Sequence, residues 1–168
     1  VFMLNREGDD FEAYSRACLH IRTKAGDVRP FKLNATQRAL HQRLEAQRKT
    51  KGKVRALVLK GRQVGISTYI GGRFYWRVTH KKGFLTQILT HLDDASDNLF
   101  SMAKRYHDMC PELVKPQTGA SNAKELKFSE LGGGYKVAGG GWISEFQNGT
   151  ITWLNDGKGN FTETITKK

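Results

Sequence analysis

The spacing of apolar residues changes several times along the first 138 residues, and each change predicts a different element. Apolar positions recur at helical intervals in residues 11–21, 68–80 and 95–110, and in a segment that begins near Asn34. Short apolar runs predict strands at residues 54–59, 84–90, 126–128 and 135–138, and Gly26 predicts a turn or short hairpin over residues 23–28. Strands that alternate with helices favour an α/β domain with a parallel sheet and flanking helices.

Two of the predicted helices carry stripes that indicate their inward faces. In residues 68–80 we expect Ile70, Phe74 and Val78 to face the sheet. In residues 95–110 the corresponding stripe consists of Leu99, Met102, Tyr106 and Met109, and Pro111 ends that helix.

The pattern changes at Gly139, where three segments alternate apolar and polar residues. They span residues 142–147, 150–154 and 160–166, and the turn-forming sequences NG and DGKG separate them. We therefore expect two units, an α/β domain over residues 1–138 and a small antiparallel meander over residues 139–168.

The most informative stretch is VRALVLKGRQVGIST at residues 54–68, which predicts a strand, a loop and a helix start in that order. Such a loop directs backbone N–H groups at one point and favours an anion there. The usual phosphate loop is G-x-x-x-x-G-K-[ST]; here Gly65 and Ser67 match, whereas Ile66 replaces the lysine and Lys60 replaces the first glycine. The predicted phosphate-binding residues are Lys60, Gly61, Arg62, Gln63, Gly65, Ser67 and Thr68, with Ser67 as a Mg²⁺ ligand. The alternative is a basic turn whose glycine only lets the helix pack closely.

The charge distribution favours a polyanionic partner. The net charge is +12, and the first 138 residues carry all of it, with 25 basic and 13 acidic residues. The densest part is RKTKGK at residues 48–53, which predicts DNA contacts by Lys49, Lys51 and Lys53; a solvated basic loop is the alternative.

The cysteines, the absence of a long apolar run and the first residue bear on the class of protein. Cys18 and Cys110 lie far apart, which favours neither a disulfide framework nor a Cys/His metal site. The sequence has no apolar run of about 20 residues and no signal-peptide pattern, so we expect no membrane partner. Because the chain begins with Val1, we expect a fragment or a processed product.

Three segments resemble the N-terminal ATPase domain of the large terminase subunit, the DNA-packaging motor of tailed bacteriophages. They are FKLNATQ at residues 31–37, LVLKGRQVGIST at residues 57–68 and ILTHLDDASDNLF at residues 88–100. Terminases often carry a phosphate loop of the form K-x-x-x-x-G-x-[ST], which Lys60, Gly65 and Ser67 fit. The resemblance implies a phosphate-loop (P-loop) fold, ATP and Mg²⁺ as cofactors, and ATP-driven packaging of double-stranded DNA. It also implies the small terminase subunit and the portal as partners, in the cytoplasm of a bacterial host.

The resemblance assigns Gln37 to the glutamine that reads the adenine. NATQ at residues 34–37 also has the spacing of a capping box, in which Gln37 returns a bond to the start of its helix. Asp93 and Asp94 follow the second strand of the family rather than its Walker B strand, and we expect one of them to cap the next helix.

The chain departs from the family after Ala138. No run of four apolar residues ends in Asp-Glu, and the nuclease domain has no counterpart in the sequence. We therefore expect nucleotide binding without a recognisable catalytic acid. The alternatives are a non-enzymatic basic DNA-binding module and another P-loop motor such as a helicase.

Overall fold

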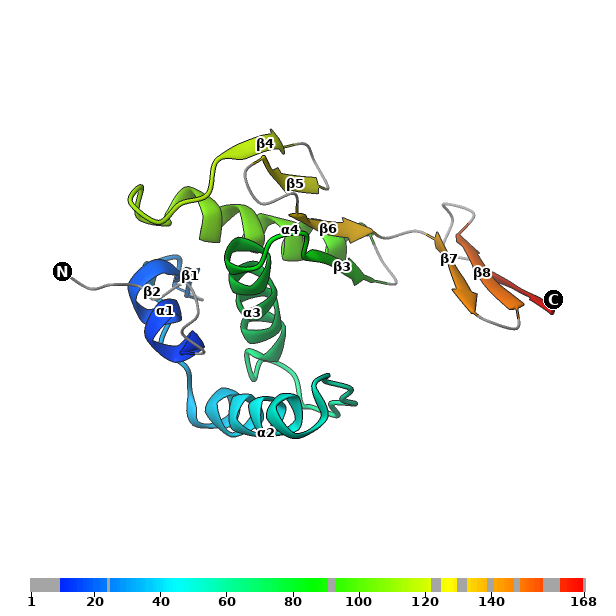
Figure 1. The fold of residues 1–168 in the computed structure, drawn as a ribbon, viewed down its shortest axis with the longest axis horizontal. Coiled ribbons are helices and arrows are strands. Elements are labelled where there is room, and N and C mark those ends of the chain that lie inside the picture. The colour runs from blue at the N-terminus through cyan, green and yellow to red at the C-terminus, as the bar shows by residue number, and fades with distance from the viewer. Residues whose placement is uncertain are drawn as a thin grey trace.

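A computed structural model describes residues 10–23, 25–90, 93–121, 125–129, 133–138, 141–146, 149–155 and 161–167. The chain is a mixed α/β protein (Figure 1). No helix among these residues is long and apolar enough to cross a membrane. Both cysteines are buried and free.

The N-terminal part is a short helix followed by a hairpin. Helix α1 spans Phe11–Cys18, and the Asp10 side chain accepts a hydrogen bond from Ala13 N at its start. Strands β1 (His20–Arg22) and β2 (Val28–Pro30) pair antiparallel. The predicted hairpin is confirmed, and Gly26 adopts a φ of 95° in its turn, where glycine is favoured.

Helix α2 (Ala35–Lys51) begins at the predicted Asn34 cap and ends at Gly52, whose φ of 67° is left-handed. The sequence pattern indicated only the start of this helix, and in the structure the basic residues continue it to Lys51. Lys49 and Lys51 lie in its last turn, where cations interact favourably with the helix dipole. The basic segment is therefore mostly a helix end rather than a loop.

The main sheet has the strand order β3-β6-β5-β4. Strands β3 (Leu85–Leu89) and β6 (Gly133–Ala138) pair parallel, whereas β5 (Glu125–Phe128) pairs antiparallel with both β6 and β4 (Thr118–Ser121). The sheet is thus mixed, whereas the sequence predicted a parallel sheet. The sequence pattern missed β4 because TGAS contains no apolar alternation.

Helices α3 (Ile66–His80) and α4 (Asp93–Asp108) pack against each other and against the sheet (Figure 1). Their contact forms an aromatic core in which four tyrosines are almost completely buried. These are Tyr69, Tyr75, Tyr106 and Tyr135. Phe11 and Phe31 extend this core toward α1 and β2.

The inward faces of α3 and α4 differ in part from those predicted. Val78 is buried as expected, but Ile70 and Phe74 are only partly buried and line cavities, while Tyr75 and Trp76 take the core positions. On α4, Tyr106 is buried as expected, whereas Met109 lies just beyond the end of the helix and is exposed.

The predicted buried strand at residues 54–59 is wrong. This segment has no regular secondary structure, and Leu57 and Leu59 are fully exposed. Both backbone groups of Arg55 bind the Gln47 side chain instead of a strand: Arg55 N donates to Oε1 (2.7 Å), and Nε2 donates to Arg55 O (3.0 Å). Within the described ranges no strand pairs with this segment, and an apolar run cannot form a sheet without a partner.

The C-terminal meander is confirmed. Strands β7 (Gly141–Phe146), β8 (Gly149–Asn155) and β9 (Phe161–Lys167) form a separate sheet with antiparallel pairing throughout. Trp142 lies opposite Trp153 in this register. The composition change at Gly139 therefore coincides with a change of sheet.

A buried ion pair connects α2 to α3. Glu45 Oε1 pairs with Arg73 Nη1, and Glu45 Oε2 accepts a hydrogen bond from Arg48 Nε at 2.7 Å. Burial raises the pKa of Glu45, but the hydrogen bonds and positive charges of Arg48 and Arg73 outweigh this effect and lower the pKa overall. The carboxylate therefore stabilises the fold above its unfolded pKa of about 4.3, and this contribution is lost as the pH falls through the lower folded value.

We predict that Glu45→Ala lowers the free energy of unfolding by about 3–5 kcal/mol, because it leaves Arg73 buried without a counter-charge. Replacing both Glu45 and Arg73 with leucine should recover most of this loss. Urea unfolding measures the change. Glu112→Ala is the control, since its pair with Lys115 is exposed and contributes less than about 1 kcal/mol. Equal losses for Glu45→Ala and Glu112→Ala would contradict the prediction.

Candidate functional site

The loop at residues 60–65 leads directly into the N-terminus of α3. Gln63 and Gly65 have left-handed φ values of 62° and 76°, and Gly65 is the helix N-cap without a side-chain cap bond. The first backbone bond of the helix runs from Tyr69 N to Gly65 O (3.0 Å). The N–H groups of the first turn, including that of Ser67, therefore have no acceptor within the helix. They form the positive end of its dipole.

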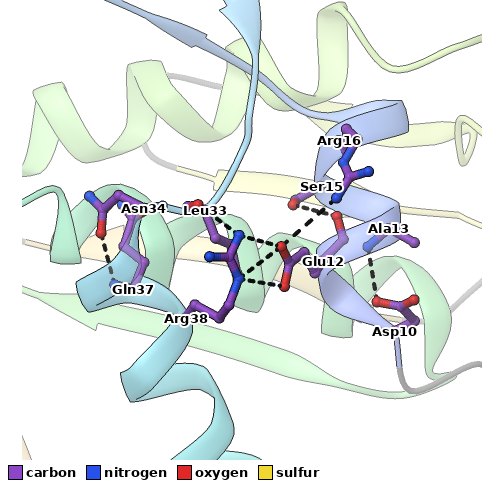
Figure 2. Close-up of polar contacts among 9 residues, drawn as sticks. All are labelled: Asp10, Glu12, Ala13, Ser15, Arg16, Leu33, Asn34, Gln37 and Arg38. Carbon is purple, nitrogen blue, oxygen red and sulfur yellow. Dashed lines mark hydrogen bonds and ion pairs between the residues drawn. The ribbon is translucent and has the colours of Figure 1, made fainter.

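Helix α2 holds this loop through two side chains at its own start. Gln37 Nε2 donates to Gly65 O (2.7 Å), and Asn34 Nδ2 donates to Val64 O (3.2 Å). Figure 2 shows Asn34 and Gln37 together at the start of α2, where Gln37 Oε1 accepts from Asn34 N and Asn34 Oδ1 accepts from Gln37 N, both at 2.9 Å. The capping box is confirmed. Gln37 is almost completely buried and uses both ends of its amide, and the adenine role stays a prediction.

An ion pair fixes the first turn of α2 against α1. Arg38 Nη2 lies 2.7 Å from Glu12 Oε1, and its Nε contacts both carboxylate oxygens at 3.1 Å (Figure 2). The hydrogen bond and charge of Arg38 lower the pKa of Glu12. The start of α2 is thus held from α1 on one side while it holds the loop on the other.

Gly65 is required by both its backbone and its surroundings. A Cβ at this position would lie 2.7 Å from Gln37 Nε2, in addition to the strain of the positive φ. At Gly61 a Cβ would meet only Val64, at 3.9 Å. The close approach of α2 is thus one sufficient reason for the glycine at position 65, as the alternative interpretation of the loop expects.

The remaining predicted phosphate ligands differ in exposure. Lys60, Arg62 and Ser67 are exposed. Thr68 is partly buried. Its hydroxyl donates to Met102 Sδ (3.7 Å), and its carbonyl accepts from the Tyr106 hydroxyl (3.1 Å). Ser67 is therefore the hydroxyl of this pair that is open to a ligand.

Two cavities flank the loop, and different predicted site residues line each of them. A cavity of about 400 Å³ between α2 and the loop is lined by Lys60 and Gly61. Another of about 340 Å³, between α3 and β3, is lined by Ser67. The structure thus places Lys60 and Ser67 on different cavities around the start of α3.

Sequence reasoning missed the α2 wall of the 400 Å³ cavity. Thr36, Leu40 and Arg43 line it, together with Val58 and Ile66. The three α2 residues follow the helical i, i+4, i+7 spacing, which could have indicated a common face. Arg43 contributes a cation and Thr36 a hydroxyl to a lining that is otherwise mainly apolar on this side.

The three predicted DNA-binding lysines cluster at the end of α2. Lys49, Lys51 and Lys53 are all exposed. Lys53 also lines a larger cavity of about 770 Å³ between this end of α2 and α3.

The acidic residues offer no evident metal centre. No group of three or more His, Cys, Asp or Glu side chains suited to a metal occurs in the described ranges. Helix α4 begins at Asp93, two residues before the predicted start, so Asp93 and Asp94 lie in its first turn rather than capping it from outside. Acidic residues there interact favourably with the helix dipole.

No protein-family model and no curated protein matches this sequence.

We predict that Gly65→Ala destabilises the protein by more than about 1 kcal/mol, because it adds φ strain and a contact with Gln37. Gly61→Ala is the matched control and should change stability by less than about 0.5 kcal/mol. Thermal unfolding by circular dichroism measures both variants. An equal effect of the two substitutions would show that α2 does not require glycine at position 65.

Proposed function

We propose that this chain is the nucleotide-binding part of a terminase-like, ATP-driven DNA-packaging motor. The observation that carries the proposal is the loop at the N-terminus of α3, where an exposed Ser67 and first-turn N–H groups without an acceptor inside the helix adjoin the exposed cations Lys60 and Arg62. This combination suits a polyphosphate with Mg²⁺. We propose a P-loop fold for the part of the chain around this loop.

In this proposal each residue has a defined task. Lys60 and Arg62 neutralise phosphate charge, the first-turn N–H groups donate to phosphate oxygens, and Ser67 is a Mg²⁺ ligand. Since Lys60 and Ser67 line different cavities, the bound triphosphate spans the helix start between them. The base then occupies the 400 Å³ cavity against Leu40 and Val58. Gln37 reads adenine only by exchanging one of its present bonds.

We predict that ATP with Mg²⁺ raises the melting temperature, because a ligand that binds the folded state stabilises it by mass action. Lys60→Ala should remove most of this shift, whereas Lys104→Ala, an exposed lysine on α4, should keep it. Differential scanning fluorimetry measures the shifts. A full shift in Lys60→Ala would contradict the assigned phosphate contact.

Hydrolysis is a separate expectation. Phosphoryl transfer depends on a group that orients the attacking water, and the sequence has no recognisable Walker B acid to do so. We expect little steady-state release of phosphate even with DNA present. Sustained hydrolysis that Lys60→Ala abolishes would identify Asp93 or Asp94 as the first candidates for the missing acid.

A non-enzymatic DNA-binding module is the second candidate. Two observations favour it, because neither is arranged for a nucleotide. Residues 54–59 pair with no strand in the described ranges, and the oxygen and nitrogen of the Gln37 amide both have partners. This candidate retains the basic surface and predicts no shift with ATP and Mg²⁺.

Both candidates predict weak binding of double-stranded DNA that is indifferent to sequence. The logarithm of the binding constant should fall by about 0.9 per neutralised phosphate for each log unit of salt. Replacing Lys49, Lys51 and Lys53 with glutamate should flatten this slope, as measured by fluorescence anisotropy. The control replaces three exposed lysines elsewhere: Lys32, Lys82 and Lys104. A slope near zero in the unmodified protein would remove DNA from both candidates.

A further inference from the structure

An open groove runs along α3 beside β3, which is an edge strand of the main sheet in the part of the chain that the structure describes. The 770 Å³ cavity lies between residues 52–58 and the start of β3, and the 340 Å³ cavity continues along β3. Ile70 and Phe74 line both cavities, so they form a continuous apolar floor. In a layered α/β fold such residues are normally covered by the sheet.

The backbone of β3 is open toward this groove. Within the described ranges β6 is the only strand that pairs with β3. Phe84 O accepts from Gly134 N, so the alternation of a strand directs the N–H and C=O groups of Thr86 and Ile88 toward β6. Those of Leu85, Gln87 and Leu89 point the other way, and an unpaired row of this kind is a template for another strand.

The groove also has a defined charge. Its larger cavity is lined by five basic residues and no acidic one: Arg48, Lys53, Arg73, Arg77 and Lys81. Glu45 neutralises two of the five, Arg48 and Arg73. Lys53 and Lys81 are exposed at the rim, and no ion pair with either lysine occurs among the described residues. The groove therefore favours a ligand that is apolar in its middle and carries carboxylates at its ends.

We infer that this groove binds an extended, acidic polypeptide segment, whose apolar residues cover Ile70 and Phe74 while its backbone adds a strand to β3. This mode of recognition combines main-chain hydrogen bonds with side-chain pockets. A second copy of this chain fits less well, because its exposed apolar segment at residues 54–59 is flanked by Lys53 and Lys60 and the net charge is +12. Nucleic acid would use the rim cations but would leave the aliphatic floor and the strand edge without partners.

The probe is a fluorescein-labelled peptide, DDVTVIVDD, titrated by fluorescence polarisation with the full chain. We expect saturable binding. One comparison peptide has lysine in place of every aspartate, and another carries N-methyl groups on alternate residues to remove half of its N–H donors. Both should bind at least about tenfold more weakly, because the first loses charge complementarity and the second loses the ladder.

Two sets of protein variants test the surface. The double variant Lys53→Glu/Lys81→Glu should weaken binding by about tenfold, while Lys32→Glu/Lys104→Glu, at exposed positions outside the groove lining, should change it less than about twofold. Gln87→Pro removes an outward N–H at an edge position that tolerates proline. It should abolish binding with an unchanged circular dichroism spectrum.

Amide hydrogen exchange gives the deciding readout, independent of whether the Gln87 variant folds. The peptide should slow exchange at Leu85, Gln87 and Leu89, and leave Thr86 and Ile88 unchanged. Equal binding of the N-methylated peptide, or no alternating protection, would overturn the proposal. So would the same alternating protection produced by a ten-nucleotide oligo(dT), or self-association that protects the same amides without peptide.

Discussion

The side-chain amide of Gln37 is the contact on which the arrangement of the loop depends. Its oxygen accepts from Asn34 N at the start of α2, and its nitrogen donates to Gly65 O at the start of α3. One buried group thereby joins the first turns of two helices. The Glu45–Arg73 pair repeats the connection about two turns further along α2. Because both contacts come from α2, the loop is positioned by a helix rather than by a strand that precedes it.

Local signals in the sequence were sufficient for the features that depend on a few neighbouring residues. Asn34 and Gln37 have the spacing of a capping box, and the structure contains that box. The hairpin at Gly26 and the three strands after Gly139 were likewise predicted from turn residues and alternation. Each of these features is complete within a short segment, so its pattern carries the information needed.

Features that need distant partners were not predictable in the same way. Residues 54–59 have the composition of a buried strand, but a strand forms only where another strand offers its backbone groups. Ile70 and Phe74 were also assigned to the core, because a helical apolar stripe was expected to face the sheet. In the structure both residues line cavities. The loop was located correctly, yet its division between two cavities depends on the position of α2, which no motif encodes.

The aromatic core sets an upper limit to the pH range in which this protein is stable. Burial raises the pKa of the Tyr69 phenol to about 12, and it raises the pKa values of Tyr75, Tyr106 and Tyr135 as well. In the unfolded chain these phenols ionise near pH 10, whereas in the fold they stay protonated. The stabilisation that each phenol contributes is therefore fully present below pH 10. It is lost as the pH rises from the unfolded pKa toward the higher folded pKa, because ionisation then favours the unfolded chain. A core that buries these phenols beside its phenylalanine and leucine residues thus makes the molecule sensitive to alkali.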